Sequence, residues 1–461
     1  MYKIFLLAFI FFLMLSCNNT LEKTDNEQAP SSKEVVLTAP EWSKNANIYE
    51  VNIRQYTPEG TFNAFDAHLP RIKEMGVDIL WLMPIFPVGE EGRKGGMGSP
   101  YSVKDYKGVN PDFGTKEDFQ NLVNHAHELG FKLILDWVAN HSAFDNVWIK
   151  DHPAWYTQDS TGRIIHPADT DWTDVADLNY DNKEMRLAMI DALQYWVKTF
   201  DIDGYRCDVA GFVPDDFWKE AILALQQTKH LFMLGEWDEA KMHDDGFHMT
   251  YGWGFHHIMN QVAKGEEPIA KIDSFLLDDA TKYKKADYRM NFTTNHDENS
   301  WNGTVYERMG IYADAMTVLA FTAQGMPLIY GGQEASLNKR LSFFEKDSID
   351  WSDLSKAVFF KKLLALKHKN EALWNGAYGG DYKRMTTTKN DAIFAYSRVK
   401  NDHVVIVMLN LSKENQTFEL TDYPGGIFTN TFTGEKQRFA IEDAPPLTFT
   451  LEAGAYIVLE K

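Results

Sequence analysis

Short apolar runs alternate with helical patterns along most of this chain. Between residue 47 and about residue 376, runs rich in Val, Ile, Leu, Phe and Tyr are separated by segments whose apolar residues recur at helical spacing. Near-continuous apolar strands are typical of a parallel sheet buried on both faces, and strand–helix alternation predicts βα units. We therefore predict an α/β fold, a (β/α)₈ TIM barrel. Its strands are expected at residues 48–53, 77–84, 131–138, 204–209, 231–236, 247–251, 290–297 and 327–332.

The pattern changes in two places, and each change predicts a separate domain. Residues 140–181 lose the periodicity and are rich in Pro, Asp, Thr and Trp, which indicates a small inserted domain after the third strand. After residue 376, strand-like runs at 392–396, 404–409 and 455–459 follow one another without helices. Residues 43–376 are therefore expected to form the barrel, and residues 377–461 a C-terminal antiparallel β-sandwich.

The N-terminus has the pattern of an export signal. Residues 1–16 carry one early lysine and then an apolar run that is too short to span a bilayer, as in a signal peptide. The run ends at Cys17 and resembles a bacterial lipoprotein signal, which implies a lipid on the Cys17 thiol. Residues 17–42 are mostly polar, which is typical of a flexible tether. The expected location is the cell envelope, anchored to a membrane; a plain secretory signal is the alternative.

Charge and cysteine content narrow the possible partners. The chain of 461 residues has 46 Lys and Arg against 66 Asp and Glu, a net charge of −20, which argues against nucleic acid as a partner. A neutral substrate suits this surface better. Only two cysteines are present, Cys17 and Cys207, so no disulfide framework is predicted.

Charged residues end several of the expected strands. Arg206 and Asp208 lie two residues apart and point to the same face of one strand, while Glu236 and Asp297 end two later runs. A structural ion pair would explain Arg206 and Asp208 alone. Three acids at strand ends favour an active site instead, because parallel barrels build their active sites at the carboxyl ends of the strands.

Several separated motifs resemble glycoside hydrolase family thirteen, the α-amylase family, from about residue 46 to the C-terminus. They occur in the family's order, and the resemblance implies the barrel, the inserted domain and the C-terminal β domain. The motifs lie at residues 99–106, 136–141, 177–179, 204–208, 235–237, 292–297 and 325–330.

The resemblance implies a role for each acid. Asp208 corresponds to the nucleophile, Glu236 to the general acid/base and Asp297 to the transition-state stabiliser. A retaining glycosidase needs one carboxylate that forms a glycosyl-enzyme and one carboxylic acid that protonates the leaving oxygen. Glu236 is therefore expected to have a raised pKa.

Four other residues are expected to bind substrate by the same resemblance. Tyr101 should stack its ring under the sugar beside the scissile bond, His141 and His296 should bind sugar hydroxyls, and Arg206 should pair with Asp208. If only the ring face of Tyr101 matters, a phenylalanine should keep most of the activity.

The leading expectation is a retaining α-glycoside hydrolase that acts on α-1,4-linked glucans or maltooligosaccharides. A transglycosylase or isomerase of the same family is the alternative, because water and sugar compete for one covalent intermediate. A non-catalytic glycan-binding lipoprotein is less favoured, because Asp208, Glu236 and Asp297 are all present.

No cofactor is expected to take part in the chemistry. Many α-amylases hold a structural calcium, and Asn140 resembles one of its ligands. The Lys-His pair that supplies another ligand is missing from the stretch that includes Ala210 and Gly211. The sequence therefore leaves calcium open, with a loop-capping role as the alternative for Asn140.

Overall fold

The computed structural model describes residues 37–439 and 446–461. The expected signal peptide, Cys17 and most of the expected tether lie outside the described residues. The last residues assigned to the tether are folded, however, because Glu41–Ser43 form a short 3₁₀ helix, η1. The Trp42 ring packs against Phe232 at a centroid distance of 5.7 Å, so burial of this indole starts the folded domain slightly before residue 43.

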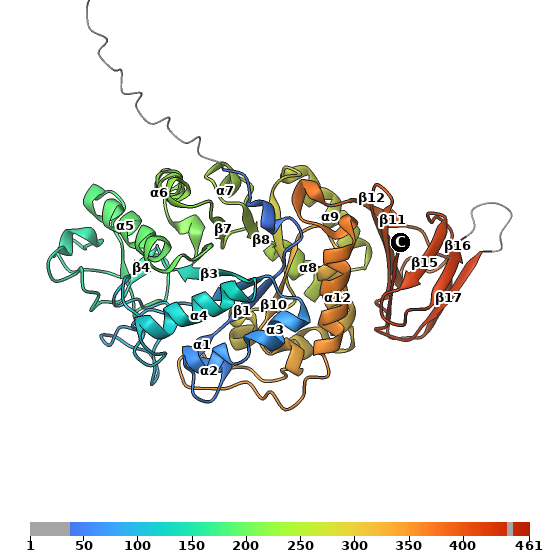
Figure 1. Ribbon diagram of the computed structural model, residues 1–461. Helices are drawn as coiled ribbons and strands as arrows, with labels where there is room; N and C mark the ends of the chain where they lie inside the picture. The colour runs from blue at the N-terminus through green and yellow to red at the C-terminus, as the bar shows by residue number, and fades with distance from the viewer. Residues whose placement is uncertain (1–36, 440–445) are drawn as a thin grey trace, which may run out of the picture. The chain divides into compact units, whose positions relative to one another are not determined.

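Eight parallel strands close into a barrel in the order β1-β10-β9-β8-β7-β6-β3-β2, which confirms the predicted fold class. Figure 1 shows helices lying outside these strands. Ile48 closes the sheet, because it pairs with Ile79 on one side and with Leu328 on the other. Apolar side chains such as Trp81 and Phe232 fill the interior. The barrel strands are β1 (Ile48–Val51), β2 (Ile79–Leu82), β3 (Lys132–Trp137), β6 (Gly204–Cys207), β7 (Phe232–Gly235), β8 (Met249–Tyr251), β9 (Tyr288–Asn291) and β10 (Met326–Tyr330).

The seventh barrel strand, β9, is shorter than predicted and ends six residues before Asp297. Beyond it, the carbonyl of Thr293 accepts a hydrogen bond from Arg308 (2.7 Å) rather than from a neighbouring strand. Asn295 accepts from the backbone of Glu298 and starts a π-helical segment, η4 (Glu298–Asn302). Side chains thus satisfy the backbone that a longer strand would have paired.

The helices around the barrel largely follow the predicted spacing. Residues 62–75 form two consecutive helices, with Pro70 in the first turn of the second one, where its missing N–H costs no hydrogen bond. None of the helices in the described part of the chain is long and apolar enough to cross a membrane. The helices are α1 (Ile53–Tyr56), α2 (Phe62–Asp66), α3 (Leu69–Met75), α4 (Lys116–Glu128), α5 (Lys183–Phe200), α6 (Asp215–Thr228), α7 (Lys241–Asp244), α8 (Trp253–Lys264), α9 (Ala270–Lys282), α10 (Val305–Met309), α11 (Ala313–Thr322) and α12 (Ala357–Lys369).

Two further antiparallel regions complete the fold. Between β3 and α5, β4 (His141–Ser142) pairs with β5 (Ala176–Asp177). After α12, a six-stranded sheet in the order β11-β12-β13-β18-β15-β16 and a two-stranded sheet, β14-β17, form the C-terminal β domain. Its strands are β11 (Asp381–Met385), β12 (Ile393–Lys400), β13 (His403–Asn410), β14 (Gln416–Leu420), β15 (Gly426–Asn430), β16 (Lys436–Phe439), β17 (Leu447–Leu451) and β18 (Tyr456–Glu460).

Candidate active site

The barrel places two of the predicted acids at the same edge. Asp208 directly follows β6, and Glu236 directly follows β7, which is the neighbouring strand. In the sheet, Arg206 of β6 lies opposite Asp136 of β3. These four side chains therefore meet at the carboxyl ends of three adjacent strands, where the resemblance and the strand pattern both predicted an active site.

Arg206 joins the acids into one network. Its guanidinium is completely buried, and Nη1 donates to Asp136 Oδ1 and to Asp208 Oδ1, both at 2.9 Å. Nη2 forms an ion pair with Glu236 Oε2 at 2.8 Å, although the two groups are not aligned as a hydrogen bond. Because a guanidinium is planar, it holds Asp208 and Glu236 at neighbouring nitrogens. Removing one partner from such a buried pair costs about 3–5 kcal/mol.

Glu236 has the raised pKa that a general acid needs. Burial raises the pKa of Glu236 to about 8; the Arg206 guanidinium opposes this shift, and the charges of Asp208 and Asp297 add to it. Oε2 accepts a hydrogen bond from the backbone N–H of Val209 at 2.8 Å. Because Oε2 accepts from Val209 and pairs with Arg206, the proton is left for Oε1.

Val209 adopts a backbone conformation that is rare for its type. Its φ is +36°, and a β-branched side chain disfavours this left-handed region. The turn directs the Val209 N–H to Glu236 immediately after Asp208. Strain of this kind persists where the surrounding structure enforces it, and it is common at active sites.

Tyr101 and His296 lie together on one side of the acids. The Tyr101 hydroxyl donates to Asp136 Oδ2 (3.1 Å) and lies 2.8 Å from His296 Nε2, while the two rings stack at 5.5 Å. Trp81 Nε1 also donates to Asp136 Oδ2 (3.1 Å). Burial raises the pKa of Asp136 to about 7, against the effect of Arg206, and Asp136 accepts from three donors.

Asp297 contacts the other site residues through His296. Its Oδ2 lies 3.4 Å from His296 Nε2, and its side chain is 35% exposed, far more than the side chains of Asp208 and Glu236, which are 10% exposed. A more open carboxylate has room to contact a bound ligand.

Sequence reasoning missed two buried acids that belong to this network. Asp136 was noticed within a motif but was given no role, and Glu50 was not singled out. Both are fully buried carboxylates on barrel strands, and Glu50 lies 2.5 Å from His296 Nδ1. An acid within an otherwise apolar barrel strand is the sequence signal that could have identified them.

His141 forms part of the wall beside Asn140. The Asn140 amide nitrogen lies 3.2 Å from His141 Nδ1, and burial lowers the pKa of His141, which is therefore neutral. The amide donates to Nδ1, so the ring proton sits on Nε2 and is available to an external acceptor. The Asn140 amide therefore contacts His141 and orients its ring.

The residues around Asn140 offer few ligands for the structural calcium that the sequence left open. Among residues 37–439 and 446–461, no three Asp, Glu, His or Cys side chains are grouped so that they could hold a metal ion. A Cβ on Gly211, in the stretch where the family's Lys-His pair is missing, would lie 2.1 Å from the Trp237 ring. Trp237 therefore fills this space.

An open cavity of about 480 Å³ connects the predicted residues. Its size is within the usual range for small-molecule sites. Acids, histidines and aromatic rings line it. The lining includes Tyr101, His141, Asp208, Glu236, His296 and Asp297, with Trp172, Trp301, Phe343 and Phe344. A second hollow of about 360 Å³ adjoins Glu236 and is lined by Val209, Trp237, Asp238, Glu239 and Trp253.

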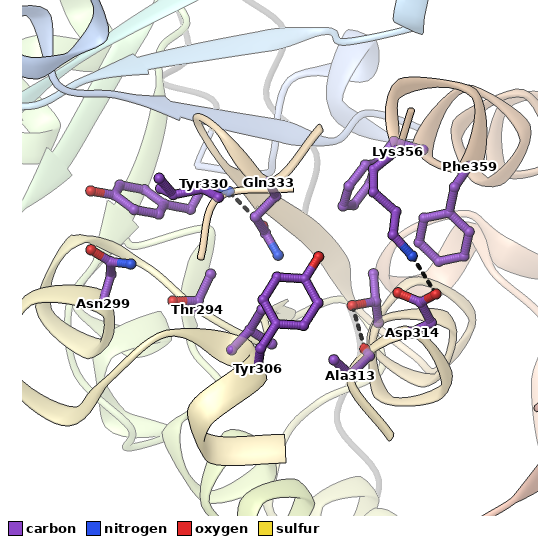
Figure 2. Close-up of a pocket in the computed structure, with 13 residues that line it drawn as sticks. Thr294, Asn299, Tyr306, Ala313, Asp314, Tyr330, Gln333, Lys356 and Phe359 are labelled. Carbon is purple, nitrogen blue, oxygen red and sulfur yellow. Dashed lines mark hydrogen bonds and ion pairs between the residues drawn. The ribbon is translucent and has the colours of Figure 1, made fainter. Parts of the chain in front are cut away.

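A much smaller cavity lies near α11 and α12 and contains none of the predicted site residues (Figure 2). It holds about 20 Å³, which is room for one water molecule. Lys356 pairs with Asp314 at its edge, and Gln333 accepts from the backbone of Tyr330 at 2.8 Å. Its volume excludes a sugar, so the larger cavity is the candidate substrate site.

Two family models match nearly the whole folded chain. The model described as alpha amylase, catalytic domain, matches residues 22–391. The model described as maltogenic amylase, C-terminal domain, matches residues 384–458. The first covers the barrel and the inserted region, and the second covers the C-terminal β domain.

Solved structures and curated relatives agree with these models. A noncanonic maltogenic alpha-amylase from Thermotoga neapolitana is 29% identical, with a TM-score of 0.82 over 91% of this chain and 99% of that one. An alpha-amylase from Lactobacillus plantarum is 30% identical, with a TM-score of 0.80 over 91% of this chain and 99% of that one.

Among curated proteins, alpha-amylase 3 from Dictyoglomus thermophilum is 26% identical over 83% of this chain and 87% of its own length. An alpha-amylase from Haloarcula japonica is also 26% identical over 86% of this chain, which spans 59% of that longer relative. The barrel, the ordered motifs and the match over residues 22–391 lead to one conclusion: this chain belongs to the α-amylase family.

Proposed function

We propose that this protein hydrolyses α-1,4-linked glucans or maltooligosaccharides with retention of configuration. One observation carries the proposal: Asp208 and Glu236 lie at neighbouring nitrogens of the buried Arg206 guanidinium, and Glu236 is the acid whose pKa is raised to about 8. A carboxylate beside a carboxylic acid is the pair that retaining hydrolysis needs, with an expected separation of about 5–5.5 Å.

The first step forms a glycosyl-enzyme. Arg206 binds Asp208 Oδ1, so Oδ2 is the oxygen that attacks the anomeric carbon. Glu236 gives its proton to the leaving glycosidic oxygen as the bond breaks, and it becomes a carboxylate. Asp297 stabilises the positive charge that develops on the sugar ring, while Tyr101 stacks beneath that ring.

The second step restores the enzyme. The Glu236 carboxylate takes a proton from water, and the water oxygen attacks the anomeric carbon and displaces Asp208. Two inversions at the same carbon give overall retention.

Transglycosylation is a second candidate, because Glu236 lines two hollows. The hollow beyond it is lined by Trp237 and Trp253, and flat apolar rings favour a sugar over water as acceptor. Relatives include a cyclomaltodextrinase from Thermoanaerobacter pseudethanolicus and a cyclomaltodextrin glucanotransferase from Bacillus licheniformis. A sugar acceptor uses the same intermediate as water.

Product analysis tests both candidates. Maltoheptaose, starch, pullulan and cyclodextrin are each incubated with the protein, and the anomeric form of the first products is followed by proton NMR. Hydrolysis predicts shorter products of α configuration, and transglycosylation adds products longer than the substrate. First products of β configuration, or no product from any of these glucans, would refute the proposal.

We also propose that the protein is a lipoprotein of the cell envelope, anchored through Cys17. The support is the apolar run that ends at this cysteine and the polar segment after it. For calcium, the crowding of Trp237 against Gly211 and the pairing of Asn140 with His141 favour an enzyme that works without the ion.

A further inference from the structure

Glu50 is a fully buried acid near the candidate site, and no step of the proposed mechanism uses it. It lies in β1, which runs next to β2 and β10, and its side chain is inaccessible to solvent. Oε1 lies 2.5 Å from His296 Nδ1, and Oε2 is buried without a hydrogen-bond partner among the described residues. A buried carboxylate in such a place is costly unless it is paired with a positive charge.

The hydrogen bonds around His296 require a proton on both ring nitrogens. A carboxylate only accepts, so Nδ1 must donate to Glu50. The Tyr101 hydroxyl has one proton and donates it to Asp136. It must therefore accept from His296 Nε2, which lies 2.8 Å away.

The charges around the ring favour the same state. Burial alone would lower the pKa of His296, but the carboxylates of Asp297 and Glu50 outweigh it and raise the pKa to about 9, with Arg206 opposing. Trp81 packs its ring edge-on at 5.9 Å and carries no charge. The groups that face His296 are Glu50 from β1, Tyr101 and Trp81 from β2 and its loop, Asp136 from β3, Arg206 from β6, and Asp297.

We propose that Glu50 is a positioning residue that keeps His296 doubly protonated, so that the imidazolium fixes Tyr101 and Asp297 beside the bound sugar. Glu50 does not touch the substrate cavity itself. It acts through His296, whose Nε2 is shared between the Tyr101 hydroxyl and Asp297 Oδ2 at 3.4 Å. A neutral imidazole with its proton on Nδ1 could not donate from Nε2 to Tyr101 or to Asp297.

The protonation state is tested directly by nitrogen-15 NMR of histidine-labelled protein, with the His296 signal identified by its loss in His296→Gln. Both ring nitrogens of His296 should be protonated at pH 7 in the wild type, and Glu50→Gln should return the ring to the neutral form at that pH. His141 is the internal control and should stay neutral in both proteins, because burial lowers its pKa. A neutral His296 in the wild type, or a charged one in Glu50→Gln, would overturn the proposal.

The second measurement rests on the proposed function and follows kcat/KM against pH. In the wild type, loss of the Glu236 proton limits activity first, because its pKa of about 8 lies below that of His296, at about 9. In Glu50→Gln, His296 loses its proton first, so the basic limb should move down by about one pH unit or more.

Glu334→Gln is the matched control for a buried charge. Glu334 is also fully buried and accepts from Tyr49 (2.5 Å) and Arg71 (3.0 Å), away from the cavity. This variant should lose stability and keep the wild-type basic limb. An unchanged basic limb of kcat/KM in Glu50→Gln, or the same shift of this limb in Glu50→Gln and Glu334→Gln, would show that Glu50 has only a structural role.

The two measurements distinguish a failure of this inference from a failure of the proposed function. If the protein degrades no glucan, the proposed function fails, while the NMR signals still decide the state of His296. If Glu50→Gln does not fold, the NMR titration of His296 in the wild-type protein tests the inference by itself. His296 should stay charged through pH 8, and a titration midpoint below pH 7 would overturn the inference.

Discussion

The hydroxyl of Tyr101 offers a sharp test of the site, because Tyr101→Phe removes a single oxygen. Tyr101 is 7% exposed, and its hydroxyl donates to Asp136. It accepts from His296 if that ring is doubly protonated, as we propose. Without it, a buried cationic donor and a buried carboxylate each lose a partner. From the sequence alone, Phe was expected to keep most of the activity, since the stacking face survives; the structure changes that expectation.

The magnitude follows from the two lost contacts. An unsatisfied buried polar group costs about 1–3 kcal/mol, and more when it is charged. Asp136 keeps Arg206 and Trp81 as donors, so most of the cost falls on His296. A loss of about 1.5–3 kcal/mol in transition-state stabilisation corresponds to about 10–160-fold in kcat/KM. Tyr101→Ala should lose more, because the stacked ring is removed as well.

The assay compares kcat/KM on maltoheptaose and the free energy of unfolding in urea for both variants. Tyr205→Phe is the matched control: this buried hydroxyl donates to the carbonyl of Leu193 at 2.6 Å, outside the cavity, so its loss should affect stability and leave turnover unchanged. Activity of Tyr101→Phe within about twofold of wild type would refute the reasoning about the hydroxyl. Equal losses in Tyr101→Phe and Tyr101→Ala would show that the ring face contributes nothing.

Four further predictions follow from the site and the N-terminus. Asp208→Ala should abolish nearly all turnover with an unchanged circular dichroism spectrum; activity within tenfold of wild type would exclude Asp208 as the nucleophile. Because Glu236 must hold its proton and its pKa is raised to about 8, the basic limb of kcat/KM should have its midpoint near this pH; a basic limb with a midpoint below pH 6 would contradict the assignment. Dialysis against a calcium chelator should leave activity and the thermal midpoint unchanged, and a loss that added calcium restores would show a bound ion. Cys17→Ser should release the protein from the membrane fraction, whereas unchanged retention would favour another anchor.

The alternation of apolar strands and helical segments was enough to predict the barrel, because strand and helix periodicity is local. All eight barrel strands were predicted, since strands buried on both faces stand out as apolar runs. The C-terminal strands were harder. Strands such as β16 and β17 are short and partly exposed, and β16 has three polar residues in a row. Only three of the eight strands in the described part of this domain were therefore recognised.

The same local signal located Asp208 and Glu236 at strand ends, but it could not show how the acids interact. Asp297 lies beyond the end of β9, and its place depends on the turn that Asn295 and Arg308 stabilise. The pKa of Glu236 depends on burial and on neighbouring charges, and neither is defined before the chain is folded.

The connection between Glu50 and His296 was decided by tertiary structure alone. The two residues are 246 positions apart, and barrel closure brings β1 beside β10 and close to the segment after β9. Periodicity specifies which face of a strand is buried, because it follows from backbone geometry within a few residues. The partner of a buried charge depends on which distant strands become neighbours, and only the closed barrel determines that.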